Sequence, residues 1–257
     1  MLLETSDLTK TYGGVKAVEK VSLSIEKGKV TSLIGPNGAG KTTLFNCITG
    51  LVSPTFGFTT FCGDTISNLK SYIISRRGIA RTFQNIRLFS DMSVLENVMV
   101  GGYITSIPTR NSFLNAILRG AFFHKKEAEL HKRAEELLDF VGISGCFDRP
   151  SRALSYGDKR RLEIARALAS SPTLLLLDEP AAGMNPTETH DLMRLIEKIR
   201  SLGITPFLIE HNMKMVMGIS DHVIVLDHGM KIAEGSPHAI QGNARVVDAY
   251  LGCQKAA

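Results

Sequence analysis

The 257-residue chain has no tryptophan, few cysteines and no apolar run approaching about eighteen residues. Its four cysteines, Cys47, Cys62, Cys146 and Cys253, form no C-x-x-C pair. This scatter favours isolated thiols in a reducing compartment over disulfides or zinc ligands. The lack of a long apolar run argues against a transmembrane helix, and the first residues lack the basic and apolar regions of a secretory signal. We therefore expect a cytosolic or membrane-peripheral protein.

The chain also lacks a large excess of either positive or negative charge. The chain has 30 basic and 25 acidic residues, a formal net charge of +5. This mild excess suits a nucleotide or a membrane surface, but it is no argument for nucleic acid. Hydrophobic residues make up 44% of the chain, enough for a substantial core in one large or two small domains.

The most informative motif fits G-x-x-x-x-G-K-[ST], the phosphate-binding loop of nucleotide-hydrolysing proteins. Its residues are Gly35, Pro36, Asn37, Gly38, Ala39, Gly40, Lys41, Thr42 and Thr43. The glycines let successive backbone N–H groups point inward as an anion nest, and the following helix turns its positive end to the phosphates. Lys41 adds a positive charge, and Thr42 offers a hydroxyl for Mg²⁺. A β-prone run before the loop and a helical run after it complete the order that the motif requires.

Two adjacent carboxylates form a second motif. Asp178 and Glu179 directly follow the apolar run Leu174–Leu177, which is typical of a strand buried on both faces. Nucleotide hydrolysis needs one acid to hold Mg²⁺ and another group to orient and deprotonate water. Asp178 suits the first role and Glu179 the second.

The remaining pattern indicates an α/β protein with a helical insertion. Strands expected at 30–34, 173–177, 203–209 and 222–226 alternate with helices expected at 155–169, 188–200 and 213–218, which predicts a parallel sheet with helices on its faces. The N-terminal part predicts antiparallel strands, among them the alternating run that contains Val18, Val21, Leu23 and Ile25. The middle, roughly 85–150, is expected to be helical, with an amphipathic helix at 125–141 that carries His131 as a surface residue. Segment 105–123 is expected to be a short helix, packed either on its own domain or against a partner or membrane.

The segment Leu154-Ser155-Tyr156-Gly157-Asp158 lies between the two motifs. Together with Gln84, His211 and the distances between these features, it is similar to the signature of the ATP-binding subunit of an ABC transporter, over essentially the whole chain. The resemblance implies an α/β fold, with a P-loop NTPase (RecA-like) core, an antiparallel β subdomain and an inserted α-helical subdomain. It implies one ATP-binding domain over 1–257, with the helical subdomain at about 85–165.

The resemblance also implies roles for single residues. Tyr12 is expected to stack on adenine, because its ring offers a π face. Gln84 is expected to reach Mg²⁺ and the attacking water, and His211 to contact the γ-phosphate and hold Glu179. Ser155 and Gly157 are expected to close over ATP held by an opposing subunit. Each ATP then lies between two chains, so a dimer of like or unlike ATPase subunits is implied, closed by ATP and reopened after hydrolysis.

Departures from the commonest family pattern narrow the resemblance. Tyr156 and Asp158 stand at the third and fifth positions of the signature, and Asn185 stands where many relatives have Asp. With the segments 81–84 and 210–213, these features resemble the larger ATPase of the bacterial branched-chain amino-acid importer. The implied partners are two transmembrane permease subunits, a second ATPase subunit and, indirectly, an external solute-binding protein. The implied location is the cytoplasmic face of the plasma membrane.

Two alternatives stay open. The same ATPase could serve another cargo, such as urea, short amides or exported lipopolysaccharide, because the cargo does not touch the ATPase chain. A soluble ABC protein acting on ribosomes or DNA is the other alternative. Such relatives carry two cassettes or long coiled coils, whereas this chain has one cassette and no sustained heptads, so no nucleic-acid partner is expected.

Overall fold

The computed structural model describes residues 1–106 and 119–252. The chain divides into a first unit, residues 1–74 with 173–257, and a second unit, residues 75–172. Cys253 and most of the expected short helix at 105–123 lie outside the described residues.

The first unit contains an antiparallel sheet with strand order β2-β1-β4-β5. Its strands are β1 (Leu3–Tyr12), β2 (Val15–Ile25), β4 (Phe56–Phe61) and β5 (Asp64–Thr65). Between the pairs Leu8–Val21 and Lys10–Val18, β2 has one residue more than β1, which is a β-bulge. The bulge explains why the buried residues Val18 and Val21 are three apart instead of two. The expected antiparallel N-terminal strands are confirmed.

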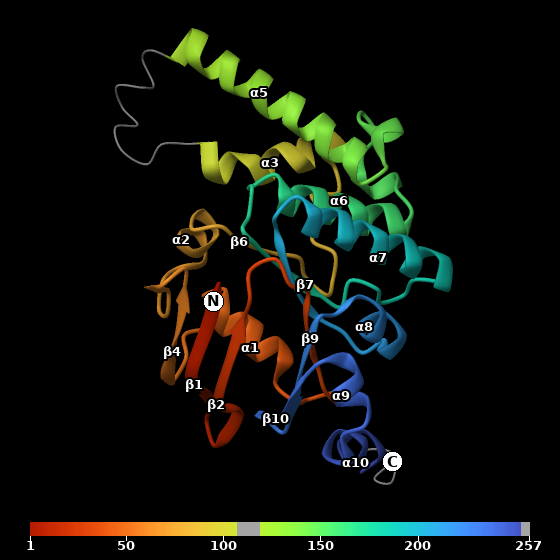
Figure 1. Ribbon diagram of the computed structural model, residues 1–257. Coiled ribbons are helices and arrows are strands. Elements are labelled where there is room, and N and C mark those ends of the chain that lie inside the picture. The colour runs from red at the N-terminus through yellow and green to blue at the C-terminus, as the bar shows by residue number, and fades with distance from the viewer. Residues whose placement is uncertain (107–118, 253–257) are drawn as a thin grey trace. The chain divides into compact units, whose positions relative to one another are not determined.

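The first unit also contains strands in the order β10-β9-β3-β8-β7. They are β3 (Thr31–Ile34), β7 (Leu174–Asp178), β8 (Thr205–Ile209), β9 (His222–Asp227) and β10 (Met230–Gly235). β3 runs parallel to β8 and β9, and β7 runs parallel to β8. Figure 1 labels β7, β9 and β10 of this group. Every residue of β3, β7 and β8 is buried, as their apolar sequences predict. Because parallel strands end at the same edge, the residues after β3, β7 and β8 come together.

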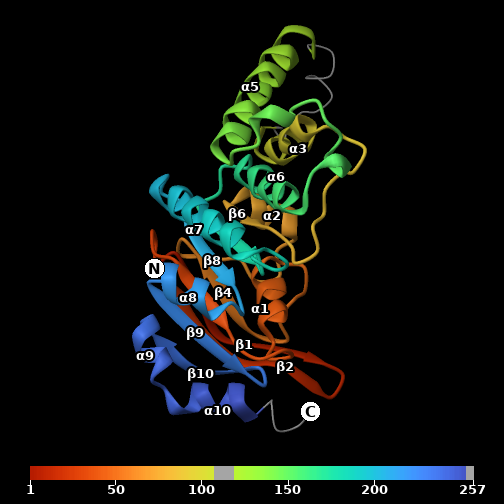
Figure 2. The ribbon, with the colours of Figure 1, turned by 90° about the vertical axis from the view of Figure 1, so that its right-hand side faces the viewer.

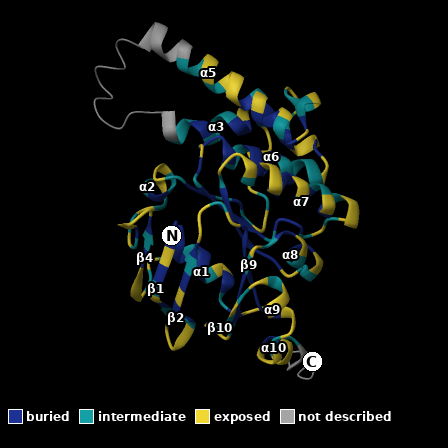
Figure 3. Ribbon diagram, viewed as in Figure 1, coloured by how far each residue is buried: buried dark blue, intermediate teal, exposed yellow. Residues whose placement is uncertain are grey.

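The helices of the first unit pack on these strands. They are α1 (Lys41–Ile48), α7 (Pro186–Ser201), α8 (Met213–Ile219), α9 (Pro237–Gln241) and α10 (Ala244–Gly252). α7 buries Leu192, Leu195 and Ile196 on one side and exposes the other, which Figure 3 shows as alternating dark and yellow turns. It begins at Asn185 with a reciprocal capping box to Glu188 and with a proline in its first turn.

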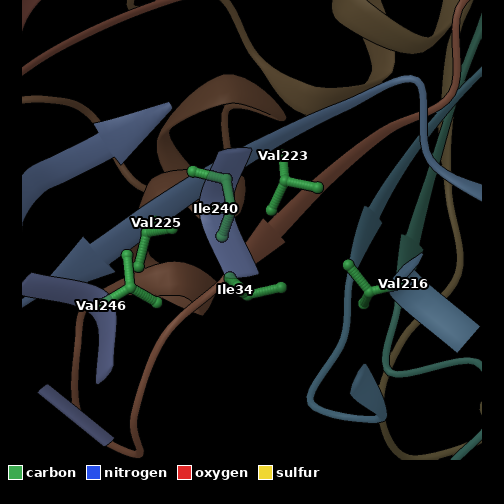
Figure 4. Close-up of a cluster of buried hydrophobic side chains, with 6 residues drawn as sticks. All are labelled: Ile34, Val216, Val223, Val225, Ile240 and Val246. Atoms are coloured by element: carbon green, nitrogen blue, oxygen red, sulfur yellow. The ribbon is translucent and has the colours of Figure 1, made fainter. Parts of the chain in front are cut away.

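A cluster of aliphatic side chains lies behind the end of β3 (Figure 4). Ile34 of β3 packs with residues of α8, β9, α9 and α10, and the cluster consists of Ile34, Val216, Val223, Val225, Ile240 and Val246. Figure 2 shows α9 and α10 beside β9 and β10. The C-terminal helices therefore support the strand whose next residue, Gly35, opens the phosphate-binding loop.

The second unit is mainly helical. It contains β6 (Ile79–Arg81), α3 (Val94–Ser106), α5 (Arg119–Phe140), α6 (Tyr156–Leu168) and the 3₁₀ turns Ser144–Cys146 and Ser151–Ala153, while α2 (Ser71–Arg76) crosses the division between the units. The expected helix at 125–141 lies in α5 with Ala134, Leu137 and Leu138 buried, and the side chain of His131 is half exposed. α3 and α6 touch through Gly101, where a Cβ would stand 2.0 Å from the Arg166 carbonyl oxygen.

The helical region starts later than the sequence predicts, at Val94 instead of near 85. Ser93 and Glu96 exchange hydrogen bonds between side chain and backbone at the start of α3, a capping box. The side-chain amide of Asn97 donates to the Phe89 carbonyl oxygen at 3.1 Å and accepts from the Phe89 N–H at 2.9 Å, which holds the preceding segment as a loop. At Phe89, bonds to the Asn97 side chain thus stand where a helix would have its own backbone bonds.

The described cysteines, Cys47, Cys62 and Cys146, are free thiols. Burial raises the pKa of Cys47 to about 11, so this thiol is unreactive at neutral pH. No described helix is both long enough and apolar enough to cross a membrane.

Candidate nucleotide-binding site

The phosphate-binding loop runs from the end of β3 to the start of α1, the strand–loop–helix order expected from the sequence. Gly40 is the N-cap of α1 and has a φ of 94°. A Cβ at this position would stand 2.2 Å from the carbonyl oxygen of Ala17, so only glycine fits. The loop is tied down by hydrogen bonds from the Ala39 amide to Pro36 and from the Gly229 amide to Ala39.

Lys41 is buried and turns back across the loop. Its Nζ donates to the carbonyl oxygens of Gly35 at 2.7 Å and Pro36 at 2.9 Å. Burial lowers the pKa of Lys41, and the charges of Glu179 and Asp178 act in the opposite direction. The ammonium group thus lies within electrostatic reach of both carboxylates that the sequence predicts for the site.

Asp178 and Glu179 stand at the carboxyl end of β7. Asp178 is the last residue of the strand and is 2% exposed. Glu179 has a φ of 47°, in the left-handed region that non-glycine residues rarely adopt, and its amide donates to the Ile209 carbonyl at 3.0 Å. Strained backbone of this kind concentrates at functional sites, because the surrounding structure must hold it in place. Here the neighbouring strand β8 holds it.

His211 faces Glu179 from the loop after β8. Its Nδ1 lies 3.8 Å from Glu179 Oε2. The imidazole is 58% exposed and the Glu179 side chain 17%, so the pair lies where water reaches it. The structure thus brings together four predicted site residues of the first unit, Lys41, Asp178, Glu179 and His211.

Glu210 is a residue of this site to which the sequence assigned no role. It is 1% exposed, and its Oε1 accepts a hydrogen bond from the Ala181 amide at 2.9 Å. Its Oε2 accepts from the amides of His211 at 3.1 Å and Asn212 at 3.3 Å. Burial raises the pKa of Glu210, and these three amides oppose the increase. The signal in the sequence was a carboxylate directly after the apolar residues Phe207, Leu208 and Ile209, a pattern similar to the one that singled out Asp178.

The other predicted residues of the first unit lie at its surface. Thr42 is exposed in the first turn of α1, so its hydroxyl is available to a ligand. Tyr12 is 47% exposed at the end of β1, and Lys10 Nζ lies 5.0 Å from the centre of its ring. A tyrosine this exposed has a free ring surface, and hydroxyl and carboxylate oxygens such as those of Thr42 and Asp178 are ligands that Mg²⁺ prefers.

Gln84, Ser155 and Gly157 belong to the second unit. The side chain of Gln84 is exposed in the loop after β6. Ser155 is the N-cap of α6, accepting from the Asp158 amide at 3.1 Å and donating to the Asp158 carboxylate at 2.8 Å. Asp158, a departure from the commonest signature, is therefore part of the cap of this helix.

A nucleotide-hydrolysing protein of the P-loop class is defined by this combination of loop, lysine and paired carboxylates on a parallel sheet. The profile of the ABC transporter family matches residues 18–182. A shorter profile, described as branched-chain amino acid ATP-binding cassette transporter, matches residues 230–252.

Curated relatives resemble the chain along its whole length. The high-affinity branched-chain amino acid transport ATP-binding protein BraF of Pseudomonas aeruginosa is 45% identical over 252 residues, which cover 98% of each chain. The protein LivG of Escherichia coli strain K12, with the same description, is 42% identical over 252 residues, again covering 98% of each chain.

Solved structures show the same fold. An ATP-binding cassette of an ABC transporter in its ADP conformation matches with a TM-score of 0.84 at 35% identity, covering 98% of both chains. A dimeric cassette in a post-hydrolysis state with ADP and Pi matches with a TM-score of 0.78 at 25% identity, covering 92% of this chain and 99% of the other.

The chain therefore belongs to the ABC transporter family. The expected fold class, a P-loop NTPase core with an antiparallel β subdomain and an inserted helical subdomain, is confirmed. The expected enzyme class, an ATPase, is confirmed by the same membership.

Proposed function

We propose that the chain is the ATP-hydrolysing subunit of an ABC importer that powers uptake of branched-chain amino acids. The observation that carries this proposal is the 45% identity to BraF across 98% of each chain. The match of residues 230–252 to the branched-chain amino acid profile supports the same cargo, because this segment lies outside the general ABC match. We also propose one domain over residues 1–257, with the helical subdomain at about 85–165.

In this proposal the first unit binds ATP. The backbone N–H groups of the loop Gly35–Thr43, to which Pro36 contributes none, surround the β- and γ-phosphates, and Lys41 exchanges its bonds to the loop carbonyls for bonds to phosphate oxygens. The exposed ring of Tyr12 stacks on adenine. Support comes from the geometry of the loop and from the buried position of the Lys41 ammonium group.

Hydrolysis is assigned to the residues that follow β7 and β8. Glu179 accepts a proton from the water that attacks the γ-phosphorus, and His211, 3.8 Å away, orients the carboxylate and contacts the phosphate. Thr42 and Asp178, with Gln84, would hold Mg²⁺. When bound, this ion neutralises charge on the β- and γ-phosphates. The exposure of His211 and Glu179 supports access of water to this position.

We propose that Ser155 and Gly157 act on ATP held by another ATPase subunit. Ser155 caps a 13-residue helix, so the positive N-terminal end of α6 is available to the phosphates of a nucleotide that binds beside Ser155. A dimeric cassette among the similar structures supports an assembly of two ATPase chains. The second chain is either a copy of this one or a different ATPase subunit.

The membrane partner is proposed to dock on a groove of the second unit. The groove is lined by Gln84, Ile86, Arg152, Tyr156 and Lys159, among others. Its mixture of apolar surface and positive charge suits a cytoplasmic loop of a permease that carries apolar and acidic residues. Two permease subunits, an external solute-binding protein and a peripheral position on the cytoplasmic face of the membrane complete the proposed assembly.

Reconstitution in proteoliposomes tests the cargo. The chain is combined with the permease subunits, the second ATPase and the binding protein encoded in the same genome, and uptake of labelled leucine is measured. We expect uptake that requires ATP, is competed by isoleucine and valine, and is lost in Glu179→Gln. Uptake of urea in place of leucine would show that the cargo is wrong, and copurification with RNA or DNA instead of permeases would overturn the transport role.

A further inference from the structure

A fully buried ion pair lies on α6, one turn beyond the cap residue Ser155. Arg160 is 0% exposed and Glu163 is 1% exposed, and Arg160 Nη1 lies 2.7 Å from Glu163 Oε2. Charged side chains are almost never fully buried unless they are paired, and a buried pair is often no more stabilising than apolar residues of the same size. The fold alone therefore does not account for a pair of charges at this place.

The pair holds the backbone of the loop that carries Gln84. Arg160 Nη1 donates to the Phe83 carbonyl oxygen at 2.7 Å, and its Nη2 donates to the Gln84 carbonyl oxygen at 2.9 Å. The Phe83 amide donates to Glu163 Oε1 at 3.1 Å. These carbonyl groups belong to the two peptide planes on either side of the Gln84 Cα, so the arginine sets the direction in which the Gln84 side chain leaves the backbone.

Arginine is the residue type that this arrangement requires. Its planar guanidinium donates to two carbonyl groups and a carboxylate from two nitrogens in a fixed geometry, whereas a lysine offers all its donors from a single atom. The Tyr156 hydroxyl lies 3.5 Å from Nη2 of the same arginine. Tyr156, the other departure from the commonest signature, thus stands beside the same arginine.

We propose that Arg160 and Glu163 are positioning residues that join the Gln84 loop and the signature helix α6 into one rigid body. A displacement of the Gln84 loop by the membrane partner then moves Ser155 and Gly157 together with it, because two buried side chains of α6 hold the loop backbone through charged hydrogen bonds. The inference rests on the proposed function of Gln84 and Ser155, and it adds the side chains that connect them.

The double variant Arg160→Met with Glu163→Leu tests the inference. It keeps a similar buried volume and removes both charges of the pair together, so neither Arg160 nor Glu163 is left buried without its partner, and the variant is expected to fold. The matched control is Arg161→Met on the same helix, because the Arg161 guanidinium donates to the Val141 carbonyl at 2.9 Å.

The first measurement is hydrogen exchange of the Phe83 amide in the full-length chain. We expect exchange to be at least about tenfold faster in the double variant and unchanged in Arg161→Met, while the melting temperatures of the two variants stay similar. Exchange at the parent rate in the double variant would overturn the inference. Should the double variant fail to fold, Arg160→Lys replaces it, because lysine keeps the charge beside Glu163 but does not span both carbonyls, and faster exchange is again expected.

The second measurement is ATP hydrolysis by the reconstituted transporter, with and without solute and its binding protein. We expect the double variant to bind Mg-ATP with parent affinity but to lose at least about tenfold of the solute-stimulated rate. A fall in affinity in proportion to the rate would indicate general damage and contradict a positioning role. If the parent transporter showed no solute-stimulated hydrolysis, the proposed function would be contradicted. The exchange measurement would still decide whether the ion pair holds the Gln84 loop.

Discussion

The carboxylate of Glu210 accepts a hydrogen bond from the amide of Ala181, 29 residues earlier in the chain, at 2.9 Å. Because the same carboxylate also binds the amides of His211 and Asn212, it connects the loop after β7 with the loop after β8. Glu179 and His211 stand on these two loops. Their separation of 3.8 Å is therefore fixed by a buried third residue.

Replacing Glu210 by glutamine is expected to destabilise the protein by about 1–3 kcal/mol, because an amide group turns donors toward backbone N–H groups that need an acceptor. The pKa of Glu210 is raised above 4.5 by burial, so the folded chain binds this proton more tightly than the unfolded chain. The contribution of Glu210 to stability is then fully present below pH 4.5 and declines as the pH rises through the folded-state pKa.

The difference in free energy of unfolding between the parent and Glu210→Gln should therefore become smaller as the pH is raised from 4.5 toward neutrality. Urea unfolding at several pH values measures this difference. The exposed Glu197, replaced by glutamine, is the control and should give a small difference at every pH. A difference that grows with rising pH would contradict the direction of the pKa shift.

Glu179→Gln is expected to bind Mg-ATP like the parent and to lose about 10²–10⁴-fold in turnover. Glutamine keeps the size of the side chain and its contact with His211 but accepts no proton from water. Nucleotide titration and steady-state hydrolysis separate the two effects, and size-exclusion chromatography with ATP should show a dimer that persists. Hydrolysis at the parent rate would show that Glu179 is not the group that accepts the proton from water.

Lys41→Ala is expected to weaken Mg-ATP binding by at least about tenfold, since charge-assisted hydrogen bonds to the phosphates are lost. Calorimetric titration measures the affinity, and thermal unfolding without nucleotide checks that the loop still folds. The control is Lys29→Ala, which removes an exposed lysine that pairs with Glu26 at the surface. Equal affinities of the parent and Lys41→Ala would count against the phosphate-binding role of the loop.

Asn185→Ala is expected to lower the free energy of unfolding by about 1 kcal/mol, because the side chain caps α7 by accepting from the Glu188 amide at 2.9 Å. Asn185→Asp should keep the stability of the parent, since both residue types are good N-caps. Chemical denaturation measures both variants. A loss in the aspartate variant as large as in the alanine variant would show that capping is not what this position contributes to stability.

Much of the fold follows from local patterns in the sequence. The phosphate-binding loop was recognisable because its glycines, Lys41 and the flanking strand and helix are neighbours in the chain. The buried strands β7 and β8 were recognisable because an apolar run of this length has few other stable environments. The parallel sheet followed from the alternation of strands and helices.

The start of α3 shows where local patterns stop being sufficient. The sequence predicts helix over residues 85–93, but the side chain of Asn97 binds both the N–H and the carbonyl group of Phe89 and holds them in a loop. A hydrogen bond from a side chain to a specific backbone group depends on the path of the chain, which periodicity does not describe. The first helix of the middle region therefore begins at Val94, later than the position near 85 from which the sequence predicts a helical region.

By itself, the sequence determined which residues carry the phosphate loop, the paired carboxylates and the signature, since each is a short motif whose chemistry depends on neighbouring residues. Only the tertiary structure decided what holds these motifs in position. Glu210 reaches Ala181 across 29 residues, and Arg160 reaches Phe83 across 77. The physical reason is that buried charges are stable only where folding supplies partners, and those partners come from distant parts of the chain.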